Sequence, residues 1–158
     1  MSTRNWITFI IVVLGITVCA CTSVSDSWKD LNEKFMKENV NKSGVHVTKS
    51  GLQYKILTQG VGLKPNYGST VQIIYTGRLI DGTRFDTTMN DTTWVDTSSK
   101  NYVANFVSGF QEALTNMNTG SRWEIYIPQS LGYGSESNGS AIPAYSTLIF
   151  DVQLLSVQ

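Results

Sequence analysis

A phenol and a carboxylate that can share a hydrogen bond flank a tight turn in the stretch IYTGRLIDGTRFD, residues 74–86. The Asp-Gly pair in its middle is a strong two-residue turn signal, and both flanks are rich in strand formers. Pairing across this turn sets Gly77 opposite Asp86 and puts Asp86 on the same face as Tyr75. We therefore expect the Tyr75 hydroxyl to donate to the Asp86 carboxylate and so to satisfy an acid buried in the sheet.

The aromatic residue before this acid, Phe85, can face either side of the sheet. Strict pairing sets Leu79 opposite Arg84 and sends Phe85 to the face opposite Asp86. The two neighbouring side chains can line one cavity only if the strand bulges or twists locally. Spacing alone leaves both arrangements open.

Other reactive residue types are few. His46 is the only histidine and has no Cys, Asp or Glu cluster nearby, so we expect a surface residue rather than a metal ligand or a base. The two cysteines, Cys19 and Cys21, are close together, and none follows them. The rest of the chain offers no disulfide framework, thiol chemistry or cysteine metal site. We expect no metal and no cofactor.

The N-terminal residues have the pattern of a bacterial export signal. Arg4 precedes an uncharged, mostly apolar run over 6–18, which is too short to span a bilayer comfortably, since a spanning helix needs roughly 20 residues. VCACTS then resembles a lipobox, apart from a Cys where Ser, Thr or Ala is more usual. We predict a lipoprotein signal peptide over residues 1–20 and a lipid on Cys21. An uncleaved N-terminal anchor is the alternative, and both readings tether the domain in the cell envelope, facing the periplasm or the exterior.

The charge balance narrows the range of partners. The chain from Cys21 onward has 138 of the 158 residues, enough for one domain with a core. It carries 11 Lys and Arg, which is the total of 12 less Arg4, against 12 Asp and Glu. A net charge of −1 without any basic run argues against nucleic acid and anionic lipid as partners.

Residues 21–50 form a spacer that is predicted to contain one short helix. Ser25 or Asp26 can cap this helix, and the Ser-Gly pair at 43–44 ends it. We expect its apolar stripe to dock on the domain rather than to bind a partner; the stripe comprises Trp28, Leu31 and Phe35.

From residue 51 onward the pattern predicts mostly strands, interrupted by one helix. Apolar residues recur at every second position over 52–56, 71–75 and 123–127, and the chain closes with a long strand over 147–157. One short helix packed on an antiparallel sheet is an α+β architecture.

The single helix has its own start, face and stop signals. Ser108 and Gln111 have the spacing of a capping box, and Gly120 supplies a C-terminal stop. Its apolar face recurs at helical spacing and comprises Phe110, Ala113, Leu114 and Met117.

Two polar loops break this regular pattern. One covers residues 87–101, and the other, over 130–144, is rich in Gly and Ser. The second carries Tyr133 and Ile142, which have no core to fill within a loop. Long loops that hold isolated hydrophobic residues often border a binding site.

The motifs taken together resemble a known family. IYTGRLIDGTRFD, followed in order by FVSGFQEAL, LGYGS, AIPA and TLIFDVQLL, resembles the FKBP-type peptidyl-prolyl cis-trans isomerases. The earlier GLQYKIL resembles the entry strand of bacterial members related to the macrophage infectivity potentiator. The resemblance implies a twisted antiparallel sheet wrapped around one short helix, with a hydrophobic pocket between them. We place this domain at 51–158.

The family's functional residues can be carried over motif by motif. The resemblance implies that the catalytic residues are Tyr75, Phe85, Asp86, Tyr133 and Phe150. It implies that the substrate-binding residues are Phe106, Val107, Phe110 and Ile142. Val107 would offer its backbone N–H to a ligand carbonyl, and Phe110 would form the pocket floor. In such a pocket Asp86 shapes the wall rather than acting as a general base.

The implied function is acceleration of X-Pro bond rotation in extracytoplasmic proteins. Its partners would be prolyl-containing polypeptides, macrolide inhibitors and the membrane that holds the lipid. Some family members dimerise through long N-terminal helical stalks, but the short spacer favours a monomer here.

Two departures from the family pattern keep alternatives open. Phe110 stands where the family usually has Trp, and Asn101 stands where a pocket-wall Phe is expected. Tyr102 or Trp94 could replace that Phe, so this wall stays unassigned. A non-catalytic prolyl-peptide binding module or holdase chaperone is the second hypothesis, and a scaffold with a closed pocket is the third.

Overall fold

The computed structural model describes residues 27–88 and 99–158. The predicted signal peptide, its neighbour Cys21, both proposed helix caps at 25–26 and the wall candidate Trp94 lie outside the described residues. Within the described ranges, no helix combines the length and apolar character needed to cross a membrane.

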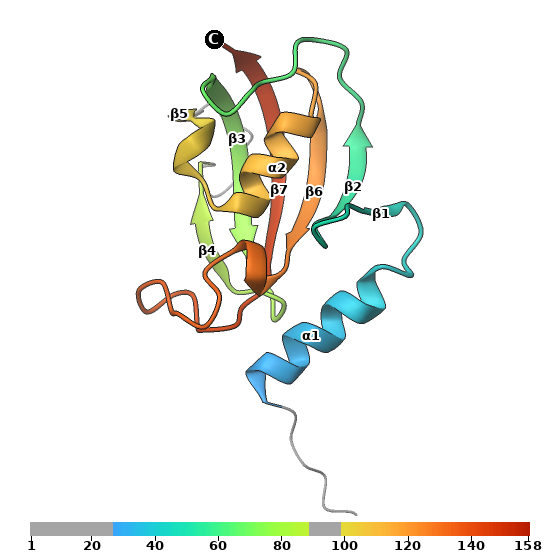
Figure 1. Cartoon of the computed structure of the whole chain (residues 1–158), viewed down its shortest axis with the longest axis vertical. Coiled ribbons are helices and arrows are strands. Elements are labelled where there is room, and N and C mark those ends of the chain that lie inside the picture. The colour runs from blue at the N-terminus through green and yellow to red at the C-terminus, as the bar shows by residue number, and fades with distance from the viewer. Residues whose placement is uncertain (1–26, 89–98) are drawn as a thin grey trace, which may run out of the picture.

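In this part of the chain, one antiparallel sheet of seven strands forms the body of the domain (Figure 1). Its order is β1 (Val45–Val47), β2 (Gln53–Thr58), β6 (Arg122–Ile127), β7 (Leu148–Val157), β3 (Thr70–Arg78) and β4 (Arg84–Thr87), while β5 (Ser99–Tyr102) also pairs with β3. The central pair, β3 and β7, sets Gly77 directly opposite Phe150. This pairing brings the turn region of the β3–β4 hairpin beside the last strand.

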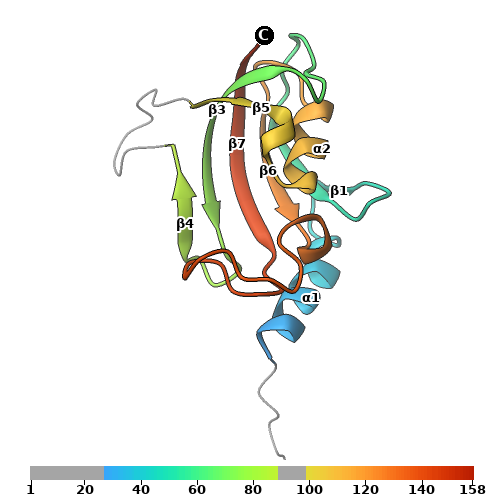
Figure 2. The same cartoon turned by 60° about the vertical axis from the view of Figure 1, so that its left-hand side comes forward.

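One short helix, α2 (Ser108–Asn116), lies across one face of the curved sheet (Figures 1 and 2). A second helix, α1 (Trp28–Asn39), lies beyond one end of the sheet (Figure 1). Of two 3-10 turns, η1 (Val103–Asn105) directly precedes α2, and η2 (Gln129–Leu131) follows β6. The predicted α+β fold, with a sheet wrapped around one short helix and a helix before it, is confirmed.

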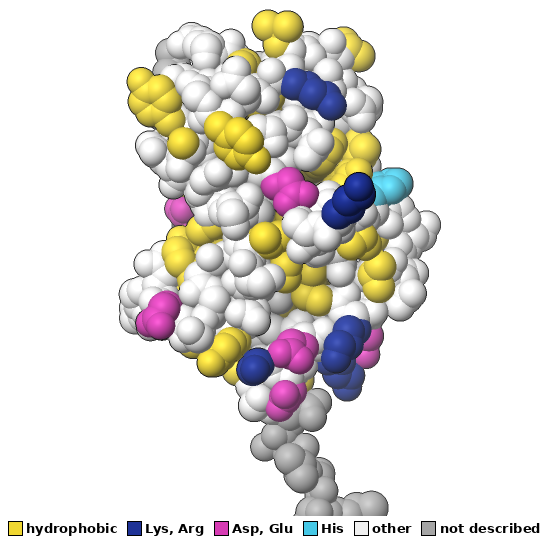
Figure 3. Space-filling view, in the orientation of Figure 1, with side chains coloured by type: hydrophobic (Ala, Val, Ile, Leu, Met, Phe, Trp, Pro, Cys, Tyr) yellow, Lys and Arg dark blue, Asp and Glu magenta, His cyan; other side chains and the backbone are white. Residues whose placement is uncertain are grey.

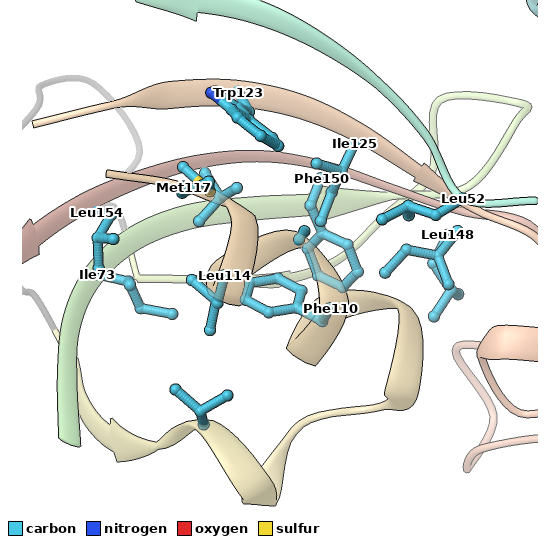
Figure 4. Packing of buried hydrophobic residues seen from close by; sticks show 14 of the residues in the cluster. Leu52, Ile73, Phe110, Leu114, Met117, Trp123, Ile125, Leu148, Phe150 and Leu154 are labelled. Atoms are coloured by element: carbon cyan, nitrogen blue, oxygen red, sulfur yellow. The ribbon is translucent and has the colours of Figure 1, made fainter. Parts of the chain in front are cut away.

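The core lies between α2 and the sheet (Figure 4). The predicted apolar face of α2 is buried: Phe110, Ala113, Leu114 and Met117 are each at most 2% exposed. It packs on the inward residues of the central strands, which include Val71, Ile73, Trp123, Ile125, Val152 and Leu154. Full burial of one such large apolar side chain contributes about 1.5–3 kcal/mol, so this layer supplies most of the force that holds α2 in place.

The predicted caps of α2 are wrong. Val107, not Ser108, is the N-cap, and the Ser108 hydroxyl donates instead to the carbonyl of Leu131 in η2, at 3.0 Å. The helix ends at Asn116, and Gly120 (φ +90°) belongs to the turn into β6, where its N–H donates to the Leu154 carbonyl. Both residues that local spacing assigned to capping, Ser108 and Gly120, instead form hydrogen bonds with residues distant in sequence.

The start and end of α1 also differ from the prediction. Ser27 is the N-cap and forms a capping box with Asp30, whose carboxylate accepts from the Ser27 N–H at 3.2 Å. The Ser27 hydroxyl lowers the pKa of the Asp30 carboxyl by hydrogen bonding to it. The helix stops at Asn39, well before the predicted stop at 43–44.

The apolar stripe of α1 docks on the domain only in part. Trp28 packs against the core, and the Phe35 ring lies 6.1 Å from that of Tyr126 in β6. Leu31, however, remains 40% exposed. The buried positions of the helix are two asparagines, Asn32 and Asn39, because their amides find polar partners in the domain.

The alternation predicted along β2 holds only at its beginning. Leu52 is buried, whereas Ile56 is exposed. The short β1 pairs only with residues 53–55 of β2, so Ile56 has a neighbouring strand on one side alone.

Charged side chains of both signs are interspersed over the face shown in Figure 3. The single histidine, drawn in cyan there, is exposed, and its ring stacks on Tyr54 with centroids 5.3 Å apart. His46 therefore lies on the surface, as predicted. Among the described residues, no group of three or more His, Cys, Asp or Glu could hold a metal ion.

Candidate functional site

A bulge in the β3–β4 hairpin settles where Phe85 points. Gly77 pairs with Asp86 as predicted, but the next residue, Arg78, pairs with Arg84, so that Phe85 is an extra residue in β4. Such a bulge lets two successive side chains reach the same cavity. The predicted pairing of Leu79 with Arg84 is therefore wrong.

The turn of this hairpin is also wider than predicted. The Leu79 N–H donates to the Thr83 carbonyl at 2.9 Å, and the Gly82 N–H donates back to the Leu79 carbonyl at 3.0 Å. Gly82 adopts φ +88°, in the left-handed region that favours glycine.

The predicted phenol–carboxylate pair is present. The Tyr75 hydroxyl donates to Asp86 Oδ2 at 2.8 Å. Burial raises the pKa of Tyr75, and the hydrogen bond to Asp86 raises it further, so the phenol stays protonated and remains a donor at neutral pH. Asp86 itself is exposed, which contradicts the expectation of a buried acid.

Five aromatic rings pack together at the bottom of the site: three lie against Phe150, and a fourth, Phe106, lies against one of those three. Phe150 meets Tyr75, Phe85 and Phe110 edge to face, with centroids 5.9, 5.4 and 4.9 Å apart. Phe106 stacks on Phe110 at 4.7 Å. Edge-to-face and offset stacking are the favoured geometries for aromatic pairs, so these rings hold one another in fixed orientations.

These rings line a cavity of about 460 Å³. All nine residues that the resemblance assigned to the pocket border it: Tyr75, Phe85, Asp86, Phe106, Val107, Phe110, Tyr133, Ile142 and Phe150. The floor residue Phe110 is only 2% exposed, whereas Tyr133 at the rim is 37% exposed. The cavity is thus apolar at its base and open to solvent at its top.

Four further lining residues were missed by sequence reasoning: Asn105, Asn138, Ala141 and Leu148. Each is close in sequence to a predicted lining residue, so proximity to the motifs was the one available signal. Of the two predicted wall candidates, only Tyr102 lies within the described residues; it is 58% exposed, and neither it nor Asn101 borders the cavity.

The entry to α2 presents a backbone donor at the cavity. The Val107 carbonyl accepts from the N–H groups of Phe110 and Gln111, at 2.9 and 3.0 Å. The Val107 N–H has no acceptor within the described ranges. The Gln111 side chain donates to the Phe106 carbonyl at 2.6 Å, which fixes the segment just before the helix.

The loop between η2 and β7 forms the opposite side of the rim. Asn138 and Ile142 exchange backbone hydrogen bonds of 2.9 and 3.3 Å, and Ile142 is buried against the cavity. The Tyr133 hydroxyl has no hydrogen-bond partner in the described part of the chain. The rim therefore offers two free donors, the Val107 N–H and the Tyr133 hydroxyl, above an aromatic floor.

Comparisons with known proteins identify the family to which this geometry belongs. A family model described as "FKBP-type peptidyl-prolyl cis-trans isomerase" matches residues 62–155, and one described as "Domain amino terminal to FKBP-type peptidyl-prolyl isomerase" matches residues 22–56.

Individual relatives agree with these matches. The chain is 43% identical over 124 residues to the FKBP-type 22 kDa peptidyl-prolyl cis-trans isomerase of Escherichia coli, covering 78% of this chain and 58% of that protein. It is 42% identical to the outer membrane protein MIP of Legionella longbeachae, covering 82% of this chain and 54% of that protein. The chain thus spans little more than half the length of these two relatives.

A solved structure shows the same fold over nearly its whole length. The peptidyl-prolyl cis-trans isomerase of Pseudomonas syringae superposes with a TM-score of 0.73 at 33% identity, covering 81% of this chain and 91% of that one. Because the family model covers more than half of the sequence, and fold and motifs agree with it, the chain belongs to the family of FKBP-type peptidyl-prolyl cis-trans isomerases.

Proposed function

We propose that this domain accelerates cis-trans isomerisation of X-Pro bonds in polypeptides outside the cytoplasm. The observation that carries the proposal is the aromatic cavity of about 460 Å³ with two unpaired donors at its rim. Prolyl-containing polypeptides are the substrates, and macrolides that mimic a prolyl group are expected to compete for the same cavity. No cofactor takes part.

The chemistry needed is modest. Rotation about a peptide bond has a barrier of roughly 18–20 kcal/mol because the amide loses its resonance when it twists. The twisted amide is less dipolar than the planar one, so an apolar, water-poor cavity stabilises it relative to the ground state. A site of this kind needs a shaped cavity rather than a nucleophile or a metal.

The lining residues divide this task. Phe85, Phe110 and Phe150 seat the prolyl ring, and their mutual packing keeps the seat rigid. The Val107 N–H and the Tyr133 hydroxyl bind carbonyl groups on either side of the rotating bond. Asp86 acts through Tyr75, because its carboxylate fixes the orientation of the phenol by their 2.8 Å hydrogen bond.

The first test is a protease-free assay of cis-to-trans relaxation in a Leu-Pro peptide. We expect clear acceleration by the wild-type protein, abolished by a prolyl-mimicking macrolide. Asp86→Val and Tyr133→Phe should each lower kcat/KM by about three- to tenfold, as expected for loss of one net hydrogen bond. Tyr67→Phe is the matched control, because Tyr67 is 59% exposed and does not border the cavity.

Other outcomes of this assay separate the alternatives. A folded protein that binds the macrolide but leaves the relaxation rate unchanged would be a binding module or holdase. That alternative is favoured by one feature, the Phe110 floor in place of the indole that the family usually has. A folded protein that neither binds the macrolide nor accelerates the relaxation would be a scaffold whose pocket is closed to ligands.

We also propose that the domain is held in the bacterial envelope by a lipid on Cys21, with residues 1–20 removed as a signal peptide. The relative named as an outer membrane protein supports an envelope location. Protein isolated from membranes should yield an N-terminal peptide that begins at Cys21 and carries a diacylglyceryl group in mass spectrometry. Cys21→Ser should leave the signal uncleaved and the peptide without lipid, and a wild-type peptide that retains residues 1–20 would contradict the proposal.

A further inference from the structure

Helix α1 contacts the loop that forms one side of the cavity rim. This segment, residues 132–147, connects η2 to β7 and carries Tyr133 and Ile142; we name it the rim loop. In Figure 2 it crosses the end of the sheet beside which α1 lies. The contacts between the two are polar and specific, although they connect segments more than 100 residues apart.

Two hydrogen bonds join α1 to the last residues of the rim loop. The Trp28 indole Nε1–H donates to the Ser146 hydroxyl at 3.0 Å, and the Thr147 N–H donates to Asn32 Oδ1 at 2.7 Å. Asn32, Ser146 and Thr147 are all at most 4% exposed. Water cannot easily replace a partner at such buried positions, so loss of either bond leaves a polar group unsatisfied.

The first of these bonds continues toward the cavity. The Ser146 hydroxyl, which accepts from Trp28, donates in turn to the Pro143 carbonyl at 2.7 Å. Pro143 directly follows Ile142, whose side chain lines the cavity. Trp28 is therefore connected to the residue after Ile142 through one hydroxyl group.

A strained residue lies in the same stretch of the rim loop. Tyr145 adopts φ +63° and is the one residue other than glycine with a positive φ among those described. Its N–H donates at 2.8 Å to the carbonyl of Gly134, next to Tyr133, and Lys29 Nζ lies 5.0 Å from the centre of its ring. A residue in this conformation persists only where surrounding contacts hold it, and α1 supplies one of those contacts.

The amide of Asn32 is held in one orientation. Its Nδ2 donates to the Trp28 carbonyl at 2.8 Å, which leaves Oδ1 facing the Thr147 N–H. Neither aspartate, which lacks the donor, nor leucine, which lacks both groups, could make this pair of bonds. The residue type thus fits a specific connection rather than general packing.

We propose that α1 is a positioning element for the cavity, in which Asn32 and Trp28 hold the rim loop so that Ile142 and Tyr133 face the bound prolyl segment. This role rests on the proposed isomerase function for its kinetic consequence, but the position of Ile142 can be measured without it. Because α1 holds one side of the rim and not the floor, it affects binding of the substrate more than the rotation step.

The chain offers a matched control within the same helix. Asn39 lies seven residues after Asn32, is also buried, and also joins α1 to the domain, by donating to Gln53 Oε1 in β2 at 2.9 Å. It makes no hydrogen bond to the rim loop. Asn39→Ala therefore loosens the attachment of α1 without removing a contact to the cavity rim.

The experiment compares Asn32→Ala, Trp28→Phe and Asn39→Ala in the full chain. It measures kcat and KM separately for the Leu-Pro peptide, the thermal unfolding midpoint, and the methyl NMR shift of Ile142, which neighbouring aromatic rings make sensitive to position. We expect Asn32→Ala to raise KM by about fivefold with kcat within about twofold, and to move the Ile142 methyl signal. Trp28→Phe should act in the same direction with a smaller effect, and Asn39→Ala should lower only the midpoint.

Each other outcome bears on one of the two proposals. The positioning role would be overturned if Asn32→Ala and Asn39→Ala changed KM and the Ile142 signal equally. It would also be overturned if neither variant changed KM or the Ile142 signal, and α1 would then be a merely stabilising element. If the wild-type protein shows no turnover, a selective shift of the Ile142 signal in Asn32→Ala supports the positioning role while the isomerase proposal fails. If Asn32→Ala does not fold, Trp28→Phe, which keeps an aromatic ring, decides by the same comparison with Asn39→Ala.

Discussion

Phe110→Ala is expected to lower the free energy of unfolding by about 3–5 kcal/mol, the usual cost of removing a buried aromatic ring. The same change should lower kcat/KM by about 100-fold or more, which corresponds to roughly 2.8 kcal/mol. Phe110 is 2% exposed, and its ring contacts those of Phe106, Tyr75 and Phe150. It is therefore part of the core and of the cavity floor at once.

The reason for the large kinetic effect is that the floor holds the walls. The Phe110 ring lies edge to face with Phe150 at 4.9 Å and with Tyr75 at 5.9 Å. Without it, both rings lose a partner and the cavity deepens into the space that the floor occupied. A prolyl ring would then contact fewer atoms, and the Tyr75 and Phe150 rings that form the walls would be less rigidly held. Both effects raise the free energy of the bound, twisted amide.

Leu114→Ala is the matched control that separates the role of Phe110 in the core from its role in the cavity floor. Leu114 lies one turn later on α2 and is also fully buried, but it does not border the cavity. Its truncation should cost about 2–5 kcal/mol of stability while kcat/KM per folded molecule changes little. Denaturant unfolding and the relaxation assay at a temperature where both variants are folded give the comparison. Equal kinetic losses in both variants would mean that Phe110 acts through the core alone.

Local periodicity was enough to predict the parts of the fold that depend on burial. The apolar face of α2 and the inward residues of β6 follow directly from their spacing, because the core-facing side of each element meets the same apolar environment along its whole length. The pairing of Gly77 with Asp86, and hence the Tyr75–Asp86 hydrogen bond, was also predicted correctly, but only because the extra residue in β4 offsets a turn that is one residue longer than predicted.

Features that depend on distant partners could not be predicted locally. The Ser108 hydroxyl donates to the Leu131 carbonyl, and the two fully buried positions of α1 are asparagines because Thr147 and Gln53 offer them hydrogen bonds. Hydrophobic periodicity has no means of recognising a polar residue that is buried with its partner. The bulge at Phe85 in β4 could not be predicted either, because bulged and regular pairing of this hairpin are compatible with the same sequence pattern.

Gly77→Ala is expected to lower kcat/KM by about 30-fold or more, roughly 2 kcal/mol, and to cost about 1–3 kcal/mol of stability through overpacking. A Cβ at this position would lie 2.7 Å from atoms of both the Phe85 and the Phe150 rings. Real Cβ contacts are not this short, so one or both aromatic walls must move. Because the two rings meet at 5.4 Å across the cavity wall, displacing one displaces the other.

Gly68→Ala is the matched control for this added methyl group. Gly68 lies in the loop before β3, and the nearest atom to its added Cβ is Asn66 Oδ1 at 3.4 Å. The exposed site has room, so stability should stay within about 0.5 kcal/mol of wild type and kcat/KM should be unchanged. Both quantities come from denaturant unfolding and the relaxation assay. If Gly77→Ala keeps wild-type kcat/KM despite losing stability, Phe85 and Phe150 do not seat the prolyl ring, and the substrate must bind elsewhere on the domain.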